Sequence, residues 1–77
     1  MQIFLNIGRN QNVGPRDIVG AIAGETGISG KLIGDIDIYD QHTLVHVPVE
    51  HADRIIEVMR RAHIRGNKLK VKHADAV

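Results

Sequence analysis

Apolar and polar residues alternate in four segments of the chain, and such alternation is typical of a β-strand with one buried face. The first segment runs from Gln2 to Gly8, and Ile3, Leu5 and Ile7 lie on its predicted inner face. The other three segments cover residues 35–39, 43–47 and 68–72. Their predicted inward pairs are Ile36 and Ile38, Val45 and Val47, and Leu69 and Val71.

Two further segments place apolar residues three and four positions apart, which predicts amphipathic helices. The first helix begins at Pro15, a residue suited to the first helical position, and ends at Gly27, which tolerates left-handed backbone. Its apolar stripe is Ile18, Val19 and Ile22. The second helix covers about residues 50–62, and its apolar face consists of Ala52, Ile55, Ile56, Met59 and Ala62.

The order of these elements is βαββαβ. Because every strand alternates, one face of the sheet is open to water and both helices cover the other. Right-handed crossovers then give a four-stranded antiparallel sheet in the order 4-1-3-2, the α+β ferredoxin-like architecture. Seventy-seven residues are enough for one domain and too few for two, so residues 1–77 are expected to form a single domain.

The composition excludes several kinds of site. The chain has no cysteine, which excludes disulfides, thiolate metal sites and thiol nucleophiles. No apolar run is long enough to span a bilayer, and the N-terminus lacks the layout of a signal peptide. We therefore expect a cytoplasmic protein with no membrane partner.

The charges are distributed unevenly although the net charge is only +1. Residues 1–59 contain four basic and eight acidic residues, whereas residues 60–73 contain six basic residues and no acidic one. This asymmetry indicates a surface that faces a polyanion; the alternative is a solvated basic surface. The six basic residues are Arg60, Arg61, Arg65, Lys68, Lys70 and Lys72.

The open sheet face contains the candidate binding residues. With Leu69 and Val71 buried, the lysines at 68, 70 and 72 emerge on that face at a pitch of about 6.5–7 Å, which suits a phosphodiester backbone. Alternatively, they protect an edge strand from aggregation. Phe4 also faces outward, either to stack on nucleobases or to lie under a chain extension or partner. Asn6 beside it either contacts base edges or is simply tolerated there.

No set of residues predicts catalysis or metal binding. Asp35 and Asp37 share the open face, but no histidine, serine or third carboxylate completes a site with them. His42 and His46 would stand about 13 Å apart on one strand, too far to chelate one ion. The eight glycines form no phosphate-binding loop. We expect no catalytic residue, no metal and no cofactor.

Several segments resemble the DbpA-type RNA-binding domain, which lies at the C-terminus of bacterial DEAD-box RNA helicases. The resemblance is carried by residues 3–9 and 14–23 and continues through 28–36, 45–48 and 64–71, including their glycines. It implies an RNA-recognition-motif (RRM) fold. It also implies a role in tethering the ATP-dependent helicase core of the same parent chain to structured RNA, often ribosomal. The 77 residues lack the helicase motifs, so the fragment itself is not expected to be an enzyme.

The resemblance also assigns roles to individual residues. Phe4 matches the stacking aromatic of the first ribonucleoprotein motif, but Leu44 and His46 stand where two aromatics are expected on the third strand. The resemblance permits contacts to shift toward the Arg9 loop, the basic last strand and the flanks of the sheet. The predicted RNA-binding residues are Phe4, Asn6, Arg9, Arg65, Lys68, Lys70 and Lys72.

A second interpretation is a protein-interaction domain of the same fold. Phe4 and Leu44 would then bury against another subunit, for example in a homodimer formed through the sheet faces.

Overall fold

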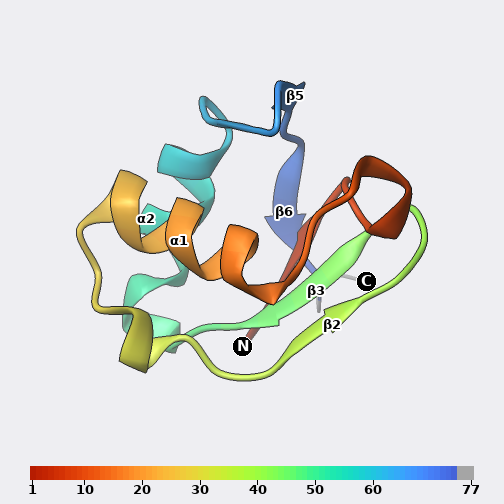
Figure 1. Ribbon diagram of the computed structural model, residues 1–77. Coiled ribbons are helices and arrows are strands. Elements are labelled where there is room, and N and C mark those ends of the chain that lie inside the picture. Colours follow the sequence, from red (N-terminus) through yellow and green to blue (C-terminus); the bar gives the residue numbers. More distant parts are fainter. Residues whose placement is uncertain (75–77) are drawn as a thin grey trace.

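The computed structural model describes residues 1–74 and contains one four-stranded antiparallel sheet in the order β2-β3-β1-β6. Helices α1 and α2 lie together on one face of this sheet (Figure 1). With β6 as the fourth strand, this is the predicted order 4-1-3-2, so the predicted fold is confirmed. The elements are β1 (Gln2–Leu5), α1 (Pro15–Thr26), β2 (Ile36–Ile38), β3 (Thr43–His46), α2 (Val49–Met59) and β6 (Val71–His73).

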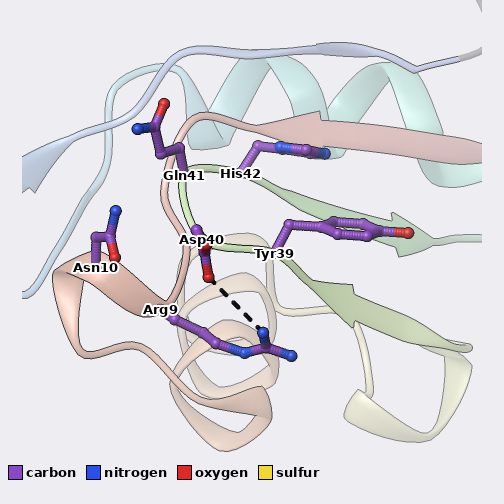
Figure 2. Close-up of a pocket in the computed structure, with 6 residues that line it drawn as sticks. All are labelled: Arg9, Asn10, Tyr39, Asp40, Gln41 and His42. Carbon is purple, nitrogen blue, oxygen red and sulfur yellow. Dashed lines mark ion pairs between the residues drawn. The ribbon is translucent and has the colours of Figure 1, made fainter.

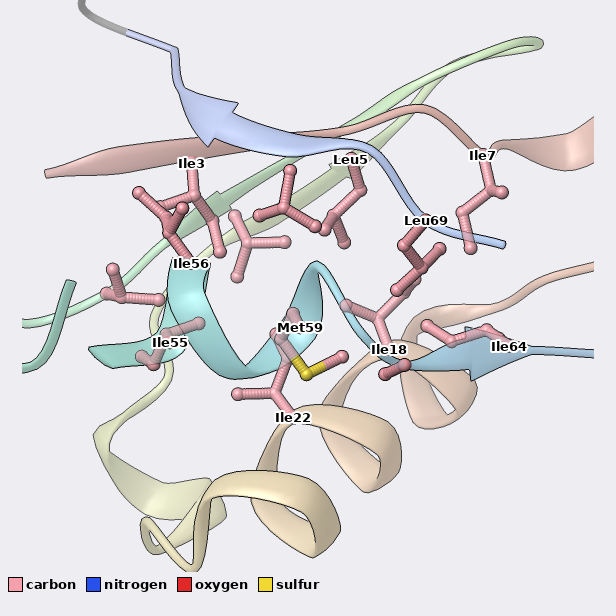
Figure 3. Close-up of a cluster of buried hydrophobic side chains, with 14 of the residues drawn as sticks. Ile3, Leu5, Ile7, Ile18, Ile22, Ile55, Ile56, Met59, Ile64 and Leu69 are labelled. Carbon is pink, nitrogen blue, oxygen red and sulfur yellow. The ribbon is translucent and has the colours of Figure 1, made fainter. Parts of the chain in front are cut away.

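The core lies between the sheet and the two helices (Figure 3). Ile3, Leu5 and Ile7 are buried, as their parity predicts, and they face Ile22 of α1 and Met59 of α2 across the interface. Val19 was predicted to belong to the α1 stripe but is only half-buried. The remaining inward residues of the four strands are buried or half-buried as expected: Ile36, Ile38, Val45, Val47, Leu69 and Val71.

The predicted strand over residues 68–72 is wrong in one respect: it is broken. Arg65 and Gly66 both have positive φ, at 50° and 79°, and they turn the chain into a two-stranded hairpin. The hairpin pairs β4 (His63–Ile64) with β5 (Asn67–Lys68) in a separate sheet. Lys68 faces His63 there, and the main sheet resumes only at Val71.

The ends of α1 agree with the sequence. The Gly14 N–H donates to Asp17 Oδ2 at 2.8 Å, so a first-turn carboxylate binds a free backbone donor at the positive end of the helix. Gly27 ends the helix with φ of 77°, a conformation that favours glycine. Within residues 1–74, no helix is long and apolar enough to cross a membrane.

Candidate nucleic-acid interface

Three rings and one ammonium group form a row across the open face of the sheet. The rings of Phe4 and His42 are stacked, with centroids 5.5 Å apart and planes 18° apart. His42 stacks in turn on Tyr39, at 4.6 Å and 17°. At the other end, Lys72 Nζ lies 5.1 Å from the centroid of Phe4, a cation–π contact. We call Tyr39, His42, Phe4 and Lys72 the ring row.

The ring row follows from strand register. Phe4 of β1 lies opposite Lys72 of β6 and Leu44 of β3, and cross-strand partners share a face. Since Ile3 and Leu5 point into the core, Phe4 must point away from it. His42 and Tyr39 come from the turn between β2 and β3, which the hydrogen bond from Tyr39 N to His42 O at 2.8 Å closes.

A close backbone approach at Gly8 holds this turn against the short helix η1 (Arg9–Gln11). The N–H groups of Arg9 and Asn10 donate to Tyr39 O at 2.8 Å and Asp40 O at 3.0 Å. A Cβ atom at position 8 would lie only 2.1 Å from Tyr39 O, so only glycine permits this contact. Gly8 therefore sets where the outer end of the ring row stands.

The inner end of the row borders a basic hollow of about 180 Å³, which we call the lysine hollow. Its lining is Phe4, Asn6, Lys70, Val71 and Lys72. Asn6 joins β1 to the segment before β6, because its Oδ1 accepts the Lys70 N–H at 2.7 Å and its own N–H donates to Lys70 O at 3.3 Å. Asn6 thus shapes the hollow, and its predicted role in reading bases stays a prediction.

A second, larger hollow of about 470 Å³ opens at the outer end of the row (Figure 2). We call it the Arg9 hollow. Arg9 Nη1 lies 3.8 Å from Asp40 Oδ1, and both side chains are largely exposed, at 69% and 75%. The hollow is lined by Arg9, Asn10, Tyr39, Asp40, Gln41 and His42.

The structure separates the residues predicted from the sequence into groups. Phe4, Asn6, Lys70 and Lys72 meet around the lysine hollow, and Arg9 lies at the other end of the ring row. Lys68 and Arg65 join neither group. Lys68 belongs to the β4–β5 hairpin, so the prediction that it continues the main sheet is wrong. Arg65 Nη2 lies 3.4 Å from Asp17 Oδ1 of α1.

The basic segment 60–73 is likewise divided. Arg61 and Arg60 approach the exposed carboxylate of Glu57 on α2, at 3.2 and 4.0 Å. Arg60 Nε also donates to Val71 O at 3.4 Å. These arginines therefore have protein partners on the helix side, and Lys70 and Lys72 are the residues of this segment that lie beside Phe4.

Sequence reasoning missed Tyr39 and His42. Parity did place Tyr39 on the outward side of its strand, but it could not bring a turn histidine between two rings. The stacked row requires the β2–β3 turn to fold back toward β1, and only the tertiary structure shows this. Within the described residues no group of three metal-ligating side chains occurs. The surface can stack on planar rings and attract anions.

Comparison with known proteins adds a family and a fold. The profile of the DbpA RNA binding domain matches residues 2–73. The chain is 31% identical over 75 residues to the ATP-dependent RNA helicase DbpA of Bacillus subtilis, and 30% identical over 73 residues to the ATP-dependent RNA helicase DeaD of Haemophilus influenzae. These alignments cover 97% and 95% of this chain but only 16% and 12% of the relatives.

Another relative is an uncharacterized protein of Treponema pallidum, which is 31% identical over 72 residues. The match covers 32% of that protein. The chain thus spans a third or less of these relatives. Among solved structures, the Nab3-RRM, studied for cis element recognition of non-polyadenylated RNAs, superimposes with a TM-score of 0.78. The match covers 99% of this chain and 96% of that one at 16% identity, which shows a shared RRM fold.

Proposed function

The chain belongs to the DbpA RNA binding domain family, and we therefore propose that it binds RNA through the open face of its sheet, along the ring row. The observation that carries this proposal is the contact of Phe4 with Lys72 beside Lys70. An aromatic ring offers a stacking surface to any base, worth about 1–3 kcal/mol each, and the adjacent ammonium groups offer point charges to the phosphates.

The proposal extends to the parent protein. Two of the relatives of this chain named above are ATP-dependent RNA helicases that are much longer than it. The domain would tether a DEAD-box helicase core, part of the same parent chain, to structured RNA in the bacterial cytoplasm. Ribosomal RNA is the structured RNA that we propose, because the resemblance to the DbpA-type domain implies it. ATP hydrolysis would belong to the core, and this domain would contribute binding alone.

The test exploits three lysines that differ in position and not in charge. Lys70→Ala and Lys72→Ala remove cations from the lysine hollow, whereas the control Lys68→Ala removes one from the β4–β5 hairpin. Binding to a ribosomal RNA hairpin is measured by fluorescence anisotropy at several salt concentrations. The first two variants should bind more weakly, and the slope of log K against log salt should flatten by roughly 0.7–0.9 per lost phosphate contact.

Lys68→Ala should change both quantities less. Equal losses for Lys68→Ala and Lys72→Ala would place the RNA on another surface. The homodimer remains the alternative use of this face. Sedimentation of the protein without RNA detects the homodimer, because an apolar dimer through Phe4 and Leu44 would persist or tighten at high salt. RNA binding, in contrast, would weaken as the salt concentration rises.

A further inference from the structure

The Arg9 hollow differs in chemistry from the lysine hollow at the opposite end of the ring row. We propose that it is a subsite for a single unpaired nucleobase, stacked on the outer face of Tyr39 and covered by the Arg9 guanidinium. This inference rests on the proposed RNA binding and adds a second contact to it. Its residues are distinct from the lysines at 70 and 72.

The stacking within the ring row decides where a base can enter. His42 is stacked on both of its neighbours, with centroid separations of 4.6 Å to Tyr39 and 5.5 Å to Phe4. No base fits between rings that already touch. The face of Tyr39 that points away from His42 has no ring partner among the described residues, and Tyr39 is 46% exposed. Tyr39 lines the Arg9 hollow, and Arg9 lies on that side of its ring (Figure 2).

Arg9 lies along the other side of this hollow. Figure 2 shows the Tyr39 ring between His42 on one side and the Arg9 side chain on the other. Unpaired RNA bases stack on aromatic rings and on arginine guanidinium planes, so the two groups together match both faces of a base. The ion pair of Arg9 with Asp40 spans 3.8 Å between exposed side chains, and such pairs contribute little stability, so the guanidinium can turn toward a ligand.

Charge favours a base over a phosphate in the Arg9 hollow. The formal charges of Arg9 and Asp40 cancel, whereas the lining of the lysine hollow has two ammonium groups and no carboxylate. A phosphate is therefore drawn to the lysine hollow. The side-chain amides of Asn10 and Gln41 each offer two N–H donors and a carbonyl acceptor for base edges.

The backbone fixes the points from which the Arg9 and Tyr39 side chains project. Arg9 N–Tyr39 O and Asn10 N–Asp40 O are short hydrogen bonds, at 2.8 and 3.0 Å, and they join η1 to the β2–β3 turn. Because these attachment points are fixed before binding, only the side chains lose conformational freedom when the ligand enters.

The experiment uses a fluorescent pool of random-sequence, single-stranded RNA octamers. Tyr39→Leu should weaken binding roughly 5- to 150-fold, the range for one stacked base, and leave the salt slope unchanged because no charge is lost. Tyr39→Phe keeps the ring and should bind like the parent. The matched control Leu32→Ala alters a side chain of similar exposure, 48%, on η2 (Gly30–Leu32), and should have no effect.

Arg9→Lys distinguishes stacking from a phosphate contact. This substitution keeps the charge and removes the planar guanidinium. The RNA affinity of Arg9→Lys should therefore fall as much as that of Arg9→Ala, while its salt slope should stay that of the parent. If Arg9→Lys binds like the parent and only Arg9→Ala fails, Arg9 holds a phosphate and the base subsite is wrong.

Direct ultraviolet crosslinking of the parent protein to the same pool does not depend on the folding of any variant. A crosslink mapped to Tyr39 supports the subsite, and crosslinks confined to other residues overturn it. If the parent protein binds the pool and Tyr39→Leu binds equally well, the subsite is wrong but the proposed function stands. Failure of the parent to bind both the pool and the ribosomal hairpin overturns the proposed function itself.

Discussion

Gly8 shows how one residue positions the candidate interface. It lies between β1 and η1, and its missing side chain lets the backbone pass directly against Tyr39 O and Asp40. The Gly8 N–H also donates to Gln11 Oε1 at 2.8 Å, which closes the first turn of η1. The positions of Arg9 and Tyr39 relative to each other therefore depend on a residue that touches no ligand.

We predict that Gly8→Ala destabilises the domain by about 1–3 kcal/mol, the usual cost of forcing an extra methyl group into a packed position. The control is Gly20→Ala, because a Cβ at this mid-helix position meets no atom within 4 Å. It should raise the free energy of unfolding by about 0.5–1 kcal/mol through better helix propensity. Urea unfolding of both variants checks this, and two equally stable variants would contradict the close approach.

Among the elements, α1 depends on its first turn for electrostatic stability. The backbone hydrogen bond from Gly14 lowers the pKa of Asp17 below its ordinary value of 3.8. Desolvation opposes this shift in part, and Arg65 adds a further lowering. Because the folded pKa lies below the unfolded one, the ionised carboxylate favours the fold. This contribution is complete above pH 3.8 and is lost as the pH falls through the folded pKa.

Asp17→Asn should therefore lower the melting temperature at pH 6, and its deficit relative to the parent should shrink as the pH is lowered below 3.8. Arg65→Ala should show a smaller version of the same behaviour, since the hydrogen bond from Gly14 is the larger cause and remains in place. Thermal melts at pH 6 and pH 3 measure both effects. A deficit of Asp17→Asn that stays constant over this range would show that the cap does not depend on ionisation.

At the scale of the whole molecule, the open face is electrically polarised. The edge strand β2 carries Asp37 opposite Leu44, on the face that Phe4 shares, and the other edge carries Lys70 and Lys72. The net charge of +1 cannot attract RNA strongly from a distance. The separation of charge across the sheet instead favours approach of phosphates at the β6 edge.

Removing one acid from this face should consequently strengthen binding. We predict that Asp37→Asn tightens RNA binding about twofold at low salt, which is the effect of removing one unit charge that lies roughly 10 Å from an RNA phosphate in water. The gain should disappear at high salt, because salt screens this interaction. Glu50→Gln makes the same charge change at the start of α2, off the sheet face, and should have less effect. Anisotropy titrations at two salt concentrations compare them; equal gains would mean that only the net charge matters.

The strands β1 and β5 differ in how well the sequence predicted them. Parity predicted correctly that Ile3 and Leu5 are buried and that Phe4 is not, because facing is a local property of extended backbone. The same reasoning failed at Lys68, because the positive φ angles of Arg65 and Gly66 start a hairpin that interrupts the alternation. The RNA-binding roles of the individual residues remain predictions.

By itself, the sequence determined the order of the main-sheet strands and the two α-helices, the inward residues of those strands and the ends of α1, since periodicity and end residues act over a few neighbouring positions. The tertiary structure alone decided which outward side chains meet. Tyr39, His42, Phe4 and Lys72 come from separate segments, and their contacts depend on strand register and on the fold of the β2–β3 turn. Register is set by hydrogen bonds and packing between distant strands, which no local pattern encodes.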